Sequence, residues 1–127
     1  MLLLLSLLSS SAVPTMEEAK AEVAFEVTQA KNELTLNLRT PNGTKLNYDA
    51  PWNLKIAKNT KNIKEFDKNS FKAPVGSKNN SATKSTHTLS IPKEAKGKKV
   101  DVELRYFICD NAVSWCKPVT HKSSIQL

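Results

Sequence analysis

The sequence predicts an all-β fold, and three observations support this prediction. Past the first twenty positions, apolar residues recur at every second position, as in a strand with one face on a core and the other in water. Turn-forming residues interrupt these runs about every ten residues, which is typical of antiparallel sheets. No long segment shows the 3.6-residue period of a helix. A chain of 127 residues is long enough for one such domain and too short for two ordinary ones.

The alternating runs and the turns between them give the expected order of strands. Short antiparallel strands at this spacing indicate a sandwich or a barrel, and we expect an immunoglobulin-like β-sandwich. The turns contain residues that favour tight backbone conformations: Lys31-Asn32, Pro41-Asn42-Gly43, Pro74-Val75-Gly76 and Lys96-Gly97-Lys98. The alternating apolar positions are Val23, Phe25 and Val27; Leu34, Leu36 and Leu38; Trp52, Leu54 and Ile56; Leu89 and Ile91; and Val100, Val102, Leu104, Tyr106 and Ile108.

Two segments depart from this pattern. Residues 57–85 are rich in Lys, Asn and Ser and contain only scattered apolar positions, among them Phe66 and Phe71. We expect one short strand in this segment, and otherwise the most mobile part of the fold, because long loops in compact domains are usually functional or disordered. Residues 16–22 are the only ones that could form a helical turn.

The first residues are interpreted as a signal peptide, residues 1–15, ahead of a domain that spans residues 16–127. The run from Leu2 to Leu8 is apolar, and Ser10-Ser11-Ala12 is similar to a signal-peptidase site. The positive residues that usually precede such a run are missing, which would follow if the true start lies upstream. A buried N-terminal strand is the alternative. The run is too short to span a bilayer. We therefore expect a periplasmic or secreted protein.

The charge of the chain excludes some partners and favours others. The formal net charge is +7, almost entirely from lysines that lie among Asn and Ser; the only arginines are Arg39 and Arg105. Because nucleic-acid surfaces favour arginine forks and stacking aromatics, we expect no nucleic-acid partner. The excess charge favours acidic partners. Only three glycines are present, without a phosphate-binding loop. Neither a serine-nucleophile motif nor paired catalytic carboxylates are found. We expect no cofactor, and we expect the protein to be a monomer.

The two cysteines carry the distinctive chemistry. Cys109 ends the clearest strand and Cys116 begins the next segment, so a hairpin of residues 100–108 and 119–127 would place them opposite each other. Their Cα atoms could then approach within the roughly 4.4–6.8 Å that a disulfide requires. In an exported protein an even number of cysteines is normally oxidised. We therefore expect one intramolecular disulfide, Cys109–Cys116.

Three interpretations of the cysteine pair are open. The bond is a structural staple worth about 2–3 kcal/mol, in which case the domain is a structural or protein-binding module. Alternatively, it is an exposed bond that takes part in thiol–disulfide exchange. Asp110 beside Cys109 and Lys117 beside Cys116 would then make Cys116 the more reactive sulfur. A zinc site with His87 and His121 is a third interpretation, but an oxidising compartment favours the disulfide, so we expect no metal.

The cysteine hairpin also resembles a known family. The stretch Leu104-Arg105-Tyr106-Phe107-Ile108-Cys109, followed by Cys116-Lys117-Pro118-Val119-Thr120, is similar to the C-terminal hairpin of the N-terminal periplasmic domain of DsbD, in the disulfide-bond corrector family. Upstream, Gly43-Thr44-Lys45-Leu46-Asn47-Tyr48 and Ala50-Pro51-Trp52-Asn53-Leu54 are similar to a second landmark of that family. The resemblance spans roughly residues 20–127.

The resemblance implies an immunoglobulin-like domain whose cysteine pair passes electrons between a membrane thiol reductase and periplasmic, thioredoxin-like oxidoreductases. It implies that Cys116 forms the mixed disulfide with a partner and that Cys109 resolves it. A cap loop with an aromatic residue shields the pair in the family, and Phe66 or Phe71 could supply it here. Two features depart from the pattern: the loop between the cysteines is one residue longer, and Lys117 stands in place of an aromatic residue.

Overall fold

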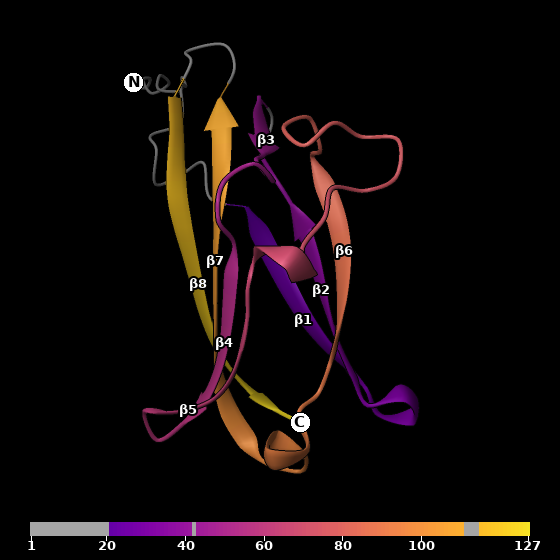
Figure 1. Ribbon diagram of the computed structural model, residues 1–127, viewed down its shortest axis with the longest axis vertical. Helices are drawn as coiled ribbons and strands as arrows, with labels where there is room; N and C mark the ends of the chain where they lie inside the picture. The colour runs from indigo at the N-terminus through magenta and orange to yellow at the C-terminus, as the bar shows by residue number, and fades with distance from the viewer. Residues whose placement is uncertain (1–20, 42, 111–114) are drawn as a thin grey trace, which may run out of the picture.

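The protein is all-β and contains two antiparallel sheets (Figure 1). The computed structural model describes residues 21–41, 43–110 and 115–127. The predicted signal peptide and most of the possible helical turn at 16–22 lie outside these residues. The elements are β1 (Glu22–Thr28), η2 (Gln29–Lys31), β2 (Glu33–Arg39), β3 (Thr44–Leu46), β4 (Asn53–Lys58), β5 (Lys61–Phe66), η3 (Lys68–Ser70), β6 (Lys84–Ser90), η4 (Lys93–Ala95), β7 (Lys99–Asp110) and β8 (Trp115–Gln126).

The predicted strands are confirmed, because each alternating run coincides with a strand. The described residues contain three single 3-10 turns, all outside residues 16–22, so the expectation that only 16–22 could form a helical turn was wrong. None of them is long and apolar enough to cross a membrane. Each of the four predicted turns contains a residue with positive φ, the backbone conformation that its residues favour. Examples are Asn32, with φ 54° at the end of η2, and Gly97, with φ 74° before β7.

The strand order makes β7 the central strand of the larger sheet. The smaller sheet has the order β1-β2-β6. In the larger sheet β8 pairs along the whole length of β7 on one side. On its other side β7 pairs with β3 near Asp110 and with β4 near its start, and β5 follows β4. Every pairing is antiparallel, and the hairpin of β7 and β8 is confirmed.

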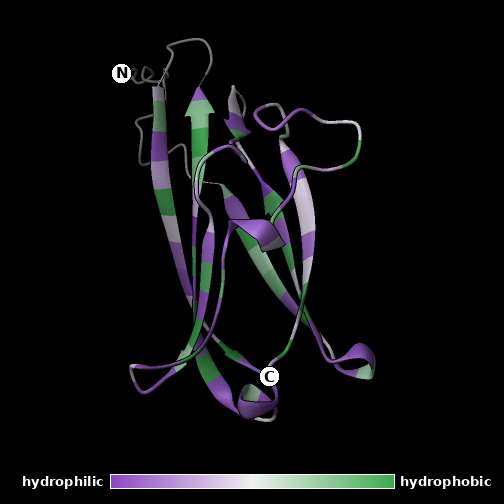
Figure 2. Ribbon diagram, in the orientation of Figure 1, coloured by the Kyte–Doolittle hydropathy of each residue, from purple (hydrophilic) through white to green (hydrophobic). Residues whose placement is uncertain are grey.

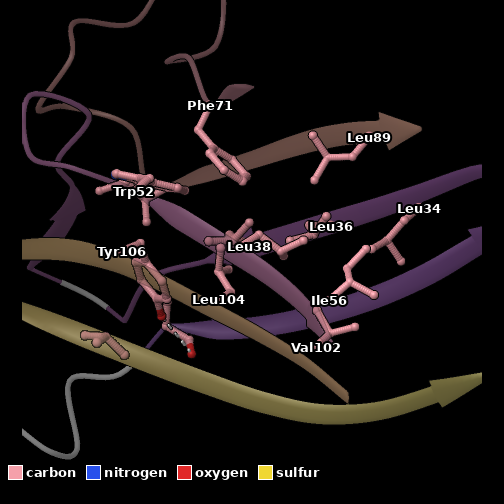
Figure 3. Packing of buried hydrophobic residues seen from close by; sticks show 14 of the residues in the cluster. Leu34, Leu36, Leu38, Trp52, Ile56, Phe71, Leu89, Val102, Leu104 and Tyr106 are labelled. Atoms are coloured by element: carbon pink, nitrogen blue, oxygen red, sulfur yellow. Dashed lines mark hydrogen bonds between the residues drawn. The ribbon is translucent and has the colours of Figure 1, made fainter. Parts of the chain in front are cut away.

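The core lies between the two sheets and is built by the period-two alternation (Figures 2 and 3). Leu34, Leu36 and Leu38 of β2 are at most 2% exposed and belong to the same cluster as the inward residues of the larger sheet. Burial of apolar area is the main favourable term in folding, so this cluster holds the two layers together. From the larger sheet the most deeply buried members are Leu46, Leu54, Ile56, Val102, Leu104, Tyr106 and Ile108.

The segment predicted to be irregular contains the expected strand and also packs against the core. The one short strand expected within residues 57–85 is β5. Residues 67–83 have no regular strand but are tied to the core: Phe71 is 3% exposed, and Ala82 forms an isolated bridge with Leu46. The Phe71 ring lies 5.4 Å from that of Trp52 and 5.3 Å from that of His87, between centroids. This segment therefore crosses one end of the core and closes it.

A first prediction tests this anchoring role of Phe71. Replacing Phe71 with Ala should lower the free energy of unfolding by about 3–5 kcal/mol, because it removes a buried ring from a packed aromatic cluster. Val75 lies in the same segment and is fully exposed, so Val75→Ala is the matched control and should change stability by less than about 0.5 kcal/mol. Urea unfolding at neutral pH measures both. Equal stabilities for the two variants would show that Phe71 is not an anchor.

Candidate functional site

The two cysteines form the predicted disulfide. Cys109 of β7 and Cys116 of β8 are direct partners in the hairpin register, and their sulfur atoms are 2.03 Å apart. Their Cα atoms are 4.0 Å apart. The bond thus joins neighbouring strands of one sheet, whereas an immunoglobulin-type bridge joins two sheets through the core.

Backbone hydrogen bonds show which kind of pair the cysteines form. In an antiparallel sheet the N–H and C=O of one residue point to the same side, and successive residues alternate. The Phe107 carbonyl accepts from the Asn47 N–H at 2.9 Å, on the β3 side of β7, and the Lys98 carbonyl accepts from the Leu127 N–H at 2.9 Å, on the β8 side. The backbone N–H and C=O groups of odd-numbered β7 residues therefore form their hydrogen bonds on the side of β3 and β4. Hence Cys109 and Cys116 are a non-hydrogen-bonded pair, the kind in which strands approach most closely.

The alternation of β7 also fixes the face on which the disulfide lies. Ile108 and Tyr106 point into the core and are fully buried, so Cys109 points to the outer face of the sheet. Cys116 is its direct partner and lies on the same face. The two cysteines differ in exposure: Cys109 is 6% exposed, whereas Cys116 is exposed. A reagent or partner therefore reaches Cys116 before Cys109.

The neighbours of the disulfide on the outer face come from three strands. Lys45 of β3 pairs directly with Cys109, on the side opposite Cys116. The next row along the hairpin holds Phe107, half-buried, and Pro118, exposed. Lys45 is thus the nearest cationic residue in the row of the disulfide. Sequence reasoning missed it, because a three-residue strand such as β3 gives too short an alternating pattern to identify.

Asp110 and Lys117, the charged residues beside the cysteines in sequence, do not lie on the face of the disulfide. Neighbours along a strand point to opposite faces. Lys117 pairs with the inward-facing Ile108, and Asp110 pairs with Trp115, so both lie on the other side of the sheet from the disulfide. Both residues interact there with other groups. The observed asymmetry between the cysteines is therefore one of burial, and the charged residue in the same row on the outer face is Lys45.

The structure does not place the two cap candidates over the disulfide. Phe71 points into the core, on the opposite side of the larger sheet from the cysteines. Phe66 ends β5, pairs with Leu54, and has the Lys64 ammonium 5.5 Å from its ring centroid. In the strand order β5 is separated from β7 by β4. In this conformation both rings belong to the packing of the fold.

His87, which the sequence offered as a possible zinc ligand, belongs to a buried polar cluster. The Tyr48 hydroxyl donates to Ser85 Oγ at 2.7 Å and lies 2.7 Å from His87 Nε2. Tyr48 stacks on Trp52 with ring centroids 4.3 Å apart. Burial lowers the pKa of His87 to about 4 and raises the pKa of Tyr48 to about 12. Both groups are therefore neutral at pH 7.

The histidines are not brought to the cysteines. His121 lies on the inner side of β8, where its Nε2 is 2.8 Å from the Tyr106 hydroxyl and its ring stacks on that of Tyr106. Burial raises the pKa of Tyr106 above its usual range. His87 lies in the other sheet. Among the described residues, no group of three or more His, Cys, Asp or Glu side chains could hold a metal ion. This arrangement gives no support to the zinc interpretation.

Comparison with protein-family models and with curated proteins finds no match to this chain.

A second prediction follows from the burial of His87. Its pKa is about 4 in the folded protein and about 6.5 when unfolded, so the unfolded chain binds more protons between these values. The stabilising effect of the neutral imidazole is complete above pH 6.5. It is lost as pH falls from 6.5 toward 4, by up to about 3 kcal/mol.

The measurement is urea unfolding of wild type and His87→Gln at pH 7, 5.5 and 4. The glutamine keeps a hydrogen-bonding side chain but does not titrate, so its stability should fall less with acid. Carboxylates titrate in both proteins and cancel in the comparison. Parallel stability curves would contradict the prediction.

Proposed function

We propose that this chain is an exported thiol–disulfide exchange domain that passes electrons through the Cys109–Cys116 pair. Its partners would be thioredoxin-like oxidoreductases or a membrane thiol reductase in the periplasm. The observation that carries the proposal is the position of the bond: it lies on the outer face of one sheet, with Cys116 exposed and Cys109 shielded.

This arrangement suits exchange because the two sulfurs can take different roles. Exchange proceeds by attack of a thiolate on one sulfur, while the other leaves as a thiolate. The exposed Cys116 is accessible to a partner. The shielded Cys109 lies next to Lys45 in the register, and a nearby ammonium group favours the thiolate form of a cysteine. Cys116 would therefore form the mixed disulfide and Cys109 would resolve it.

The bond adds little to the hairpin as a structural element. The register of β7 and β8 runs without a break from Lys99↔Gln126 to Asp110↔Trp115, and Val119 of β8 is buried in the core. The cysteines are only seven positions apart in sequence. The disulfide thus closes a short loop between strands that are already paired, where the entropic gain from a cross-link is smallest.

The immunoglobulin-like fold, the DsbD-type family and the export of the protein are also parts of this proposal. Two antiparallel sheets that share one core are compatible with an immunoglobulin-like sandwich and with the DsbD-type family to which the hairpin is similar. An oxidised cysteine pair is compatible with export, since disulfides persist mainly outside the cytosol. The alternative is a structural or protein-binding module with an inert disulfide, and the burial of Cys109 favours it.

A third prediction separates these two functions. A redox-active pair should equilibrate with a thiol buffer at a reduction potential above about −300 mV, whereas structural bridges in secreted proteins typically lie below that value. Mass spectrometry after quenching with an alkylating agent measures the reduced fraction at each buffer potential. A value well below −300 mV would leave the pair as a structural staple.

A fourth prediction assigns the roles of the sulfurs. In Cys109→Ser, Cys116 can attack a partner disulfide but no internal thiol can release the adduct, so a mixed disulfide should accumulate. In Cys116→Ser it should not, because Cys109 is shielded. Non-reducing gels of tagged variants from the periplasmic fraction show the adducts, and the double serine variant is the control. An adduct only in Cys116→Ser would reverse the assignment.

A further inference from the structure

The outer edge of β8 beside Cys116 presents backbone N–H and C=O groups that do not take part in the pairing with β7. Within the described residues β8 pairs with β7 and with no other strand. Because Cys109 and Cys116 are a non-hydrogen-bonded pair, the backbone N–H and C=O of Cys116 point away from β7. The same parity applies to every even-numbered residue of β8. These residues therefore direct their peptide groups to the outer edge of the sheet.

Pro118 gives independent support for this parity. Pro has no N–H, and within sheets it is confined to positions where an N–H would not be needed for pairing. Pro118 pairs with Phe107, whose carbonyl is bonded on the β3 side, so the missing N–H lies on the outer edge of β8. The proline therefore removes no hydrogen bond from the hairpin with β7. On the outer edge, Cys116 then retains a complete N–H and C=O pair, and so does Thr120.

We infer that the edge of β8 at Cys116–Thr120 is a docking site for an extended peptide segment of the redox partner, the segment that carries the reacting cysteine. This inference rests on the proposed exchange function and adds how the partner is recognised. An exposed edge strand is a template for pairing with another chain, and backbone hydrogen bonds of this kind are a recurrent mode of peptide recognition.

The register explains why such docking would bring the sulfurs together. An incoming residue directly opposite Cys116 would form a hydrogen-bonded pair with it, with Cα atoms about 5.5 Å apart. That distance falls within the roughly 4.4–6.8 Å range of disulfide-bonded cysteines. Its side chain would lie on the same outer face. The row would then run from Lys45 through Cys109 and Cys116 to the partner's cysteine.

This row has the geometry that the chemistry needs. The attacking partner thiolate forms a bond to Cys116 Sγ, the Cys109–Cys116 bond breaks, and its electron pair leaves on Cys109 Sγ. Displacement at sulfur is in line, so an attacker beyond Cys116 is placed opposite the leaving Cys109. The partner's second thiolate then attacks the partner sulfur of the mixed disulfide and releases Cys116 as a thiolate. The partner dithiol is oxidised to a disulfide, and the pair in this domain is reduced by two electrons.

Two peptide probes test the inference on the wild-type protein. The first is a reduced nine-residue peptide with a central cysteine, Thr, Ser and Val elsewhere, and blocked ends. The second is the same peptide N-methylated at the cysteine, which removes the N–H that would donate to the Cys116 carbonyl. The rate at which each peptide reduces the Cys109–Cys116 bond is normalised for the thiolate fraction of that peptide. This rate should be about tenfold higher for the first peptide, because the methylated peptide loses one to two net hydrogen bonds. Equal rates would overturn the inference.

A pair of protein variants locates the contact. Thr120→Pro removes an outward N–H near Cys116, and Ser124→Pro removes one of the same parity farther along the edge. Both should keep the hairpin, which thermal unfolding and disulfide mapping check. Thr120→Pro should reduce the advantage of the unmethylated peptide, and Ser124→Pro should preserve it. An equal advantage in both variants would exclude this part of the edge.

2-Mercaptoethanol, which has no peptide group, separates failure of docking from failure of the proposed function. Its rate should be the same for wild type and both variants. A reduction potential above about −300 mV with no peptide advantage would refute edge docking and leave exchange intact. A potential well below that value would refute exchange itself, whatever the peptides show.

Discussion

The alternation of β7 is the constraint on which the rest of this structure depends. One face of this strand supplies five buried side chains to the core, from Val100 to Ile108, and the other carries Cys109. Its inner face thus fixes the packing of the two sheets while its outer face fixes where the disulfide lies. The same parity determines on which side each peptide group bonds. A shift of one residue in register would exchange the faces and place the disulfide in the core.

The different exposure of the two cysteines follows from the order of strands. β7 has neighbours on both sides, and β3 pairs with Cys109 through Lys45. β8 lies at the edge of the described sheet, so Cys116 has one strand neighbour there. Direct partners in one ladder thereby acquire unequal accessibility from the number of strands beside them. Local charge in the sequence, which suggested the same asymmetry, is directed to the other face.

Sequence reasoning located the strands and the disulfide because both depend on local signals. Period-two alternation marks β1, β2, β4 and β7, and the spacing of the two cysteines marks the hairpin that adds β8. It failed where tertiary contacts decide. β3 is too short to carry a pattern, Lys117 required knowledge of the face, and Phe71 lies in a polar segment whose only strong signal is one aromatic residue. Its burial is determined by Trp52 and His87, which are distant in sequence.

The short strand β3 connects the buried polar cluster to the disulfide. Its Lys45 faces outward beside Cys109, its Leu46 N–H donates to the Ala82 carbonyl at 2.8 Å, and the following Asn47 donates to Phe107. Tyr48, the next residue along the chain, belongs to the buried polar cluster with His87. The position of β3 thus depends on the packing of residues 67–83 and on a neutral His87. Because β3 is the neighbour of Cys109 on the side opposite Cys116, the burial of Cys109 depends in part on the same contacts. The part of the core that closes one end of the molecule therefore also helps to make Cys116 the accessible member of the pair.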